Sequence, residues 1–134
     1  MANLMVSNMT QENKELLFKD LSARLPYHVK CKVWLEYGTE EGLLDLQHNY
    51  GDVLQDAFYY DKIKDIKPYL LPLSSMTEEQ TEELIKLINT GQNDNNEFMR
   101  SLCRIDFYHK HHIDYRGLIP MGLAIDATNL GIYE

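Results

Sequence analysis

The residues best suited to chemistry in this sequence gather in one short stretch, between positions 106 and 114. Asp106, His109 and His112 follow one another at intervals of three residues, so on a helix they would share one face. One carboxylate and two imidazoles are donors that bind divalent transition metals. One hypothesis for this chain is therefore a metal-binding protein, or a metal-dependent enzyme, built on these three residues.

The same stretch has a simpler interpretation, which we favour. Lys110, His111 and His112 place basic side chains at the end of a predicted helix, where the helix dipole is negative. Asp114 can then cap the following turn. The order of the metal-type residues matches no zinc-protease or deaminase signature, and the helix is expected to end where the third ligand is needed. Helix-end charge placement explains the stretch without a metal.

A second feature is a basic face on the same predicted helix. Arg100, Arg104, Phe107 and His111 follow at intervals of four, three and four residues, so they lie on one side of a helix. This face could bind an acidic partner or form a dimer contact, with Phe107 as the anchor and the arginines as donors. In the alternative, which we prefer, Phe107 packs inward and the arginines pair with acidic neighbours.

No other motif indicates catalysis. Cys31 and Cys103 lie in no nucleophile, metal-clip or redox spacing, and we expect both to be free thiols. Ser74 and Ser75 are explained as helix caps, and the chain has no glycine-rich phosphate loop. We therefore expect no catalytic residue and no cofactor, and a non-enzymatic protein rather than an enzyme.

The first element that must position these residues is a helix over Gln11–Leu25. Its leucines recur at helical spacing with charged residues between them, and they are Leu16, Leu17, Leu21 and Leu25. Thr10 can cap the helix and Pro26 stops it. The pattern predicts an amphipathic helix at the start of the chain.

Strands follow. Val29–Tyr37 alternates apolar and polar residues, which is typical of a half-exposed strand, and Trp34 falls on its polar face, either covered or exposed for a partner. Leu43–His48 and Val53–Tyr60 continue an antiparallel meander. Lys67–Pro72 contains two prolines, which permit only an edge strand or an extended segment. We expect three or four antiparallel strands, with a small barrel as an alternative.

Two more helices complete the pattern. Thr77 can cap the first of them while Gln80 reaches back, and Thr90-Gly91 ends it. After a polar loop, a third helix over Glu97–Lys110 carries an apolar stripe expected to face the core. The stripe consists of Phe98, Leu102, Ile105 and Tyr108 or His109.

The tail is predicted as turns packed on the core over Asp114–Ile125, because two glycines and a proline interrupt its apolar residues. Asp126–Glu134 is expected to fray. The whole pattern predicts one α+β domain over residues 1–134, with an N-terminal helix, a small antiparallel sheet, two further helices and a coiled tail.

Charge and hydropathy narrow the function classes. Lys and Arg total 13 against 21 Asp and Glu, a net charge of −8, which disfavours nucleic-acid binding. An acidic regulator or mimic of nucleic acid is an alternative. The apolar runs are too short to cross a membrane, and the start of the chain does not read as a secretory signal, so we expect a cytoplasmic protein.

Three phrases carry a resemblance to known sequences. They are DLSARLPY at 20–27, DIKPYL at 65–70 with SSMTEE at 74–79, and HHIDYRGLI at 111–119. Together they resemble a family of short uncharacterised proteins from gut anaerobes, often associated with prophages and other mobile elements. The resemblance implies an accessory protein of a mobile element and brings no activity with it. Trp34–Tyr60 matches poorly, so a partner preference could differ there.

The function most consistent with the sequence is a non-enzymatic protein-interaction module that binds a protein partner or a second copy of itself. Its recognition would depend on surface complementarity, through aromatic and arginine side chains. The candidate anchors are Trp34, Tyr50, Arg100, Arg104 and Phe107.

Overall fold

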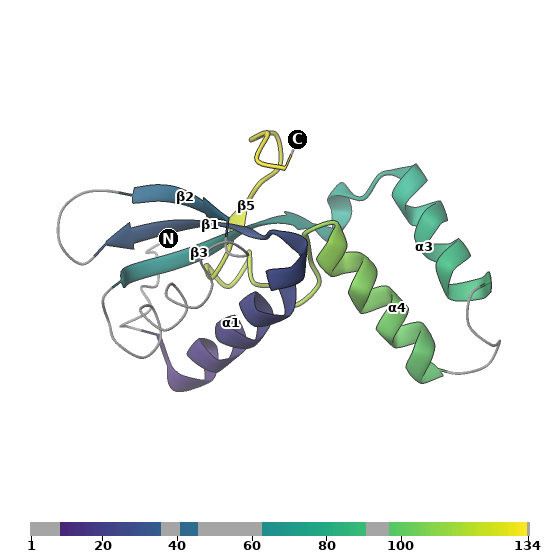
Figure 1. The fold of residues 1–134 in the computed structure, drawn as a ribbon, viewed down its shortest axis with the longest axis horizontal. Helices are drawn as coiled ribbons and strands as arrows, with labels where there is room; N and C mark the ends of the chain where they lie inside the picture. Colours follow the sequence, from purple (N-terminus) through teal and green to yellow (C-terminus); the bar gives the residue numbers. More distant parts are fainter. Residues whose placement is uncertain (1–8, 36–40, 46–62, 91–96, 134) are drawn as a thin grey trace.

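The structure is a computed structural model that describes residues 9–35, 41–45, 63–90 and 97–133. Helix α1 precedes three strands, and two further helices and two short strands follow them, so the α+β class is confirmed (Figure 1). The helices are α1 (Gln11–Arg24), α3 (Glu78–Thr90) and α4 (Glu97–Lys110), with short 3-10 turns η2 (Leu25–Tyr27) and η3 (Leu73–Ser75). The strands are β1 (Lys30–Leu35), β2 (Glu41–Asp45), β3 (Ile63–Pro72), β4 (Ile113–Asp114) and β5 (Ile125–Asp126). The predicted strand Val53–Tyr60 lies outside the described residues.

The sheet is mixed and open, whereas the sequence predicted an antiparallel sheet or a small barrel. Its order is β2-β1-β3-β4, with β5 also paired to β3. β1 is antiparallel to both β2 and β3, but β4 and β5 run parallel to β3. A parallel neighbour requires a long crossover, and η3, α3 and α4 provide that crossover between β3 and β4.

β3 is the central strand, so the prediction of an edge strand at Lys67–Pro72 was wrong. The two prolines are tolerated because each occupies the last pair of a ladder. Pro68 pairs with Cys31 at the end of the β1 ladder, and Pro72 pairs with Asp114 at the end of the β4 ladder. A proline at the end of a ladder removes no interior hydrogen bond.

The core lies between α1, one face of the sheet and the tail (Figure 1). Leucines of α1 pack on alternate residues of β1, where Cys31 and Val33 are buried while Lys32 and Trp34 are half-buried. This alternation is the one predicted for the strand. The core side chains include Leu17, Leu21, Val29, Cys31, Val33, Ile66, Leu70, Leu118 and Leu123.

Side chains cap the N-termini of α1 and α3, as predicted. Thr10 Oγ1 accepts a hydrogen bond from the Asn13 backbone N–H at 3.1 Å at the start of α1. At the start of α3, Gln80 N–H donates to Thr77 Oγ1 at 3.1 Å, and Thr77 N–H donates to Gln80 Oε1 at 3.0 Å. This reciprocal pair is a capping box.

The tail is anchored beyond Asp126, where the sequence predicted fraying. Ala127 is buried and its N–H donates to Leu70 O at 2.8 Å. The Tyr133 hydroxyl donates to Tyr69 O at 2.7 Å and accepts from Lys30 N–H at 2.9 Å. These bonds join the tail to β1 and β3, a long-range pairing that local sequence does not display.

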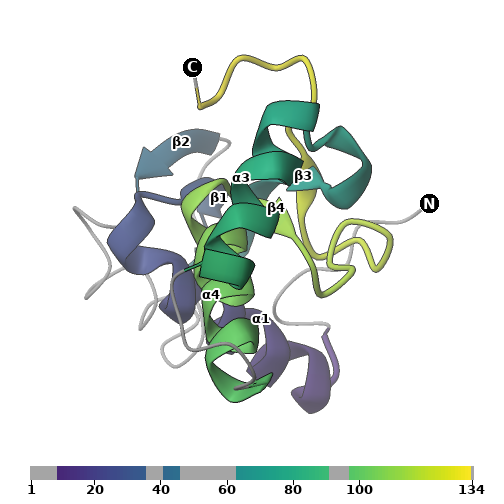
Figure 2. The same ribbon diagram turned by 90° about the vertical axis from the view of Figure 1, so that its right-hand side faces the viewer.

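The α3–α4 hairpin projects beyond the end of the sheet, away from the core (Figure 1). Seen from that side, α3 and α4 lie in front of the strands (Figure 2). The C-terminal part of α4 lies near α1, where His109 is buried and close to Arg24.

Candidate functional site

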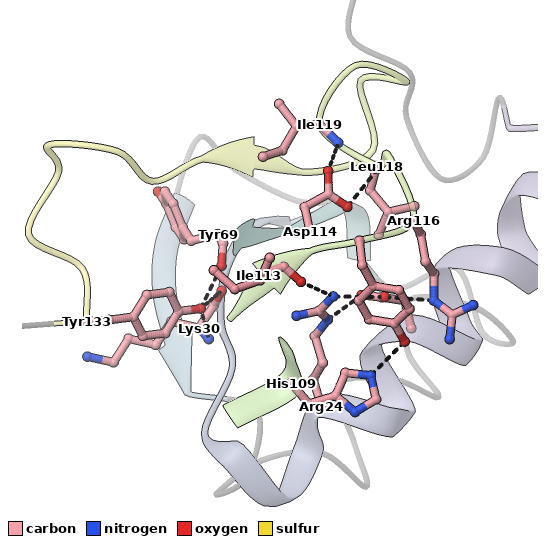
Figure 3. A network of polar contacts seen from close by, with 12 residues as sticks. Arg24, Lys30, Tyr69, His109, Ile113, Asp114, Arg116, Leu118, Ile119 and Tyr133 are labelled. Carbon is pink, nitrogen blue, oxygen red and sulfur yellow. Dashed lines mark hydrogen bonds and ion pairs between the residues drawn. The ribbon is translucent and has the colours of Figure 1, made fainter. Parts of the chain in front are cut away.

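A buried ion network fixes the base of α4 to α1 (Figure 3). Asp20 and Arg24, both on α1, are 0% exposed. Arg24 Nε donates to Asp20 Oδ2 at 2.8 Å, and Arg24 Nη2 donates to the Ile113 carbonyl oxygen at 2.8 Å. Ile113 lies three residues after the end of α4. Arg24 therefore joins α1 to the segment that follows α4.

Asp20 also binds a second arginine. Arg116 Nε donates to Asp20 Oδ1 at 3.0 Å, so one buried carboxylate lies between two guanidinium groups. The ring of Tyr115 packs beside both, with the Arg24 and Arg116 guanidinium carbons 5.4 and 4.9 Å from its centroid. A buried charge must be paired and hydrogen-bonded, and this network does both for Asp20.

Asp114 shapes the turn after the network, as the sequence predicted. Its buried carboxylate accepts hydrogen bonds from Leu118 N–H and Ile119 N–H, both at 2.9 Å (Figure 3). Capping of these amides holds the chain in the turn that carries Leu118 into the core.

His109 and Tyr115 form a second contact within the base. His109 Nε2 lies 2.7 Å from the Tyr115 hydroxyl. Burial, followed by the charge of Arg24, lowers the pKa of His109 below its ordinary value, so the imidazole is neutral near pH 7. Burial raises the pKa of the Tyr115 hydroxyl, and the pair is therefore an uncharged hydrogen bond.

The three residues of the metal hypothesis are engaged separately. The Tyr27 hydroxyl donates to Asp106 Oδ1 at 3.0 Å, and His109 bonds Tyr115. α4 ends at Lys110, and His112 adopts a left-handed φ of 59°, so its ring leaves the helix face. It stacks on Tyr133 with centroids 3.6 Å apart. Within the described residues no three metal-type side chains converge, because the helix stops before the third ligand.

The candidate anchors of the interaction hypothesis are also scattered. Phe107 is 3% exposed, and its ring packs on His111 at 4.4 Å, so it is buried and not a surface anchor. Arg104 is exposed and Arg100 is half-buried. Trp34 is half-buried on β1, with Lys32 Nζ 5.2 Å from its ring centroid. Tyr50 lies outside the described residues.

The surface that sequence reasoning missed is the apolar stripe of α4. Phe98, Leu102 and Ile105 are 68%, 45% and 37% exposed, although the sequence predicted that they face the core. We refer to these three residues as the α4 stripe. The helical period was visible in the sequence, but the side on which the core lies was not. The projection of the hairpin leaves the stripe uncovered by the described residues.

A pocket lies on α4 beside this stripe. Its volume is about 210 Å³, and it is formed where α3, α4 and η2 meet. The lining is mostly apolar, with two charged residues at its wall. The lining residues are Tyr27, Leu87, Cys103, Asp106, Phe107 and Lys110. We refer to this site as the Tyr27 pocket.

A larger cavity of about 350 Å³ lies between the end of α4 and the tail, beside His111, His112 and Tyr133. Burial, with smaller contributions from neighbouring cationic groups, lowers the pKa of His112 to about 4. His111 Nε2 and His112 Nδ1 make no hydrogen bond within the described part of the chain. His111 Nε2 lies 4.0 Å from Glu83 Oε2 on α3.

In the ranges that the structure describes, no helix is long and apolar enough to cross a membrane. Comparisons with models of protein families, with curated proteins and with solved structures found no match. Inference about function therefore depends on the geometry of α4 and its surroundings.

Proposed function

We propose that this protein is a non-enzymatic interaction module that binds an α-helix of a protein partner through the α4 stripe. The observation that carries the proposal is the exposure of Phe98, Leu102 and Ile105 at 68%, 45% and 37%. Their spacing of four and three residues is the pattern by which one helix packs its apolar side into another protein.

The exposure is unusual because the three side chains are contiguous. Single exposed apolar residues are common, whereas contiguous apolar surface marks a binding site or a liability to aggregate. Phe98 is also an aromatic side chain, and aromatic residues are enriched among those that dominate binding energy. A partner helix that covers the stripe would remove this surface from water.

The base of α4 supports a binding role by holding the helix in place. Arg24, Asp20 and Arg116 join α1 to the segment that follows α4. His109, near the end of α4, is buried close to these charges. Within positions 106–116, His109 bonds Tyr115 and Arg116 bonds Asp20 of α1. Rigid presentation of a helix lowers the entropy lost on binding.

The biological setting is part of the same proposal. The resemblance to proteins of mobile elements supports an accessory role there. Cys31 and Cys103 are both free thiols, which supports a reducing compartment such as the cytoplasm.

Site-specific photo-crosslinking in the host cell tests the proposal. A photoreactive amino acid at Leu102 is expected to give a discrete cross-linked product, while the same group at Glu82, which is exposed on α3, gives none. A second substitution, Phe98→Asp, should lower the yield of the cross-linked product formed from position 102. Equal cross-linking from positions 102 and 82, or a product insensitive to Phe98→Asp, would contradict a binding role for the stripe.

A further inference from the structure

The cavity of about 350 Å³ beside the end of α4 has the size of a small-molecule site. We refer to it as the tail cavity, because the tail forms one of its walls and the end of α4, the first turn of α3 and the end of β3 form the rest. Small-molecule sites have volumes of about 300 to 1,000 Å³, and an apolar cavity of about 150 Å³ already accepts benzene. The tail cavity therefore has room for a ring together with a charged group.

The charge of the lining differs from that of the chain. The chain contains 21 Asp and Glu against 13 Lys and Arg, yet among the described residues that line the tail cavity none is acidic, and Lys110 supplies a cation. Glu83 approaches the lining from outside, with its carboxylate 4.0 Å from His111 Nε2 and its side chain 48% exposed. A concave site lined by one sign of charge attracts a ligand of the opposite sign. The lining therefore favours an anion.

The two histidines that follow Lys110 add hydrogen-bonding groups without a partner. His111 Nε2 and His112 Nδ1 are buried and make no hydrogen bond within the described part of the chain. Burial lowers the pKa of both rings, so each is neutral near pH 7 and carries one N–H. A buried polar atom that lacks a hydrogen bond costs free energy. An oxygen of a bound anion would accept from such an N–H and supply the missing partner.

The remainder of the lining suits the carbon part of an organic ligand. Leu71, Ala127 and Ile132 contribute apolar surface, against which carbon atoms are removed from water.

The wall formed by the tail is held in place before any ligand binds. The Tyr133 hydroxyl bonds Tyr69 O and Lys30 N–H (Figure 3), and the Tyr133 ring stacks on His112 with centroids 3.6 Å apart. A preformed cavity lowers the entropy lost on binding. The tail cavity is thus formed by the fold itself.

We infer that the tail cavity binds a small organic oxyanion, a carboxylate or a phosphate ester. Lys110 and the two histidines bind its charged group, and its carbon part lies against the apolar lining. The site is separate from the α4 stripe, so this inference goes beyond the proposed function and does not depend on it.

Nuclear magnetic resonance of the purified, ¹⁵N-labelled full chain tests the inference at pH 7. The probes are benzoate and phenyl phosphate, with benzamide as a neutral molecule of the same shape as benzoate and inorganic phosphate as an anion without a carbon part. Benzoate or phenyl phosphate should bind with a dissociation constant of about 1 mM or below. The imidazole nitrogens of His111 and His112 should shift, while those of His109, outside the lining, should not.

Lys110→Gln tests the cation, and Lys19→Gln is its matched control. Both lysines are exposed, but Lys19 lies on α1. Lys110→Gln should raise the dissociation constant of the anionic probe at least about threefold, and Lys19→Gln should leave it unchanged. The amide spectrum of each variant shows that the fold is retained.

The two anionic probes distinguish the two sources of the charge. Binding of benzoate alone identifies a carboxylate ligand, and binding of phenyl phosphate alone identifies a phosphate ester. Benzamide should bind at least about tenfold more weakly than benzoate, and inorganic phosphate more weakly than phenyl phosphate.

Four results would overturn the inference. They are the absence of shifts at His111 and His112 with both anions up to about 10 mM, equal binding of benzoate and benzamide, equal binding of the two phosphates, and equal effects of Lys110→Gln and Lys19→Gln. None of these results bears on cross-linking from Leu102, so failure of the tail cavity as a site is distinguishable from failure of the proposed function.

Discussion

At the scale of single residues, the shared carboxylate of Asp20 has the largest structural consequence. Arg24 and Arg116 both donate to it, and Arg24 and Asp20 are fully buried. Removal of one member of a buried ion pair leaves an uncompensated charge, which costs more than the pair contributes. Asp20 therefore links α1 to the segment after α4.

We expect Asp20→Asn to lower the free energy of unfolding by about 3 kcal/mol or more, because two guanidinium groups lose their negative partner. Urea denaturation followed by circular dichroism measures the change. The control is Glu12→Gln, an exposed site on the same helix, which should change stability by less than about 0.5 kcal/mol. Similar losses for the two variants would refute the structural role of Asp20.

The pKa of His112 predicts how stability depends on pH. Burial holds this pKa at about 4 in the folded protein, against about 6.5 in the unfolded chain. Between these values the unfolded state binds the proton and the folded state does not, so stability is complete above pH 6.5 and decreases as the pH falls toward 4. Solvent screening of the partly exposed ring reduces the effect to roughly 2 kcal/mol.

The variant His112→Asn tests this dependence. Asparagine tolerates the left-handed backbone of this position, φ 59°, and does not titrate. The loss of stability between pH 6.5 and 4 should be smaller in the variant than in the wild type, whatever its stability at pH 7. Thermal unfolding measured across this range gives the slopes, and parallel curves would show that His112 is not responsible.

At the scale of secondary-structure elements, the capping box of α3 can be tested in isolation. Thr77→Ala removes the oxygen that accepts from Gln80 N–H and should cost about 1 kcal/mol. Thr77→Ser retains the acceptor and serves as the control. Amide hydrogen exchange in the first turn of α3 reports the difference, and equal exchange in the two variants would contradict the role of the cap.

The elements also show where local sequence was informative. The boundaries of α1 and α4 and the turn at Asp114 were predictable, because caps, proline and helical periodicity act within a few residues. The position of β3 was not predictable. Prolines exclude a residue from the interior of a ladder, but only the pairing pattern shows that Pro68 and Pro72 fall at ladder ends.

The three residues of the metal hypothesis do not converge in the structure, for a related reason. Asp106, His109 and His112 have the spacing of one helix face, but that spacing has meaning only while the helix continues. α4 ends at Lys110, and contacts to Tyr27, Tyr115 and Tyr133 hold the three side chains apart. Two of these contacts depend on tertiary structure that brings η2 and the tail to α4.

At the scale of the whole molecule, the α4 stripe contributes little to the stability of the isolated chain, because its side chains are exposed to water. We expect Phe98→Ala to change the free energy of unfolding by less than about 0.5 kcal/mol. Urea denaturation measures the change, and a loss above about 2 kcal/mol would show that the stripe packs on the rest of the chain.

The sequence by itself determined the elements whose interactions are local. The ends of α1, the Thr77–Gln80 cap and the alternation of β1 depend on residues a few positions apart. The apolar period of α4 was equally clear, because a helix displays its stripe whatever covers it.

Only the tertiary structure decided which surface each pattern meets. The stripe of Phe98, Leu102 and Ile105 has the same spacing whether it packs on the core or faces solvent, and among the described residues the projection of the α3–α4 hairpin leaves the three side chains largely exposed. The physical reason is that periodicity records the side of an element on which apolar residues lie. The contact that buries them is set by the path of the whole chain.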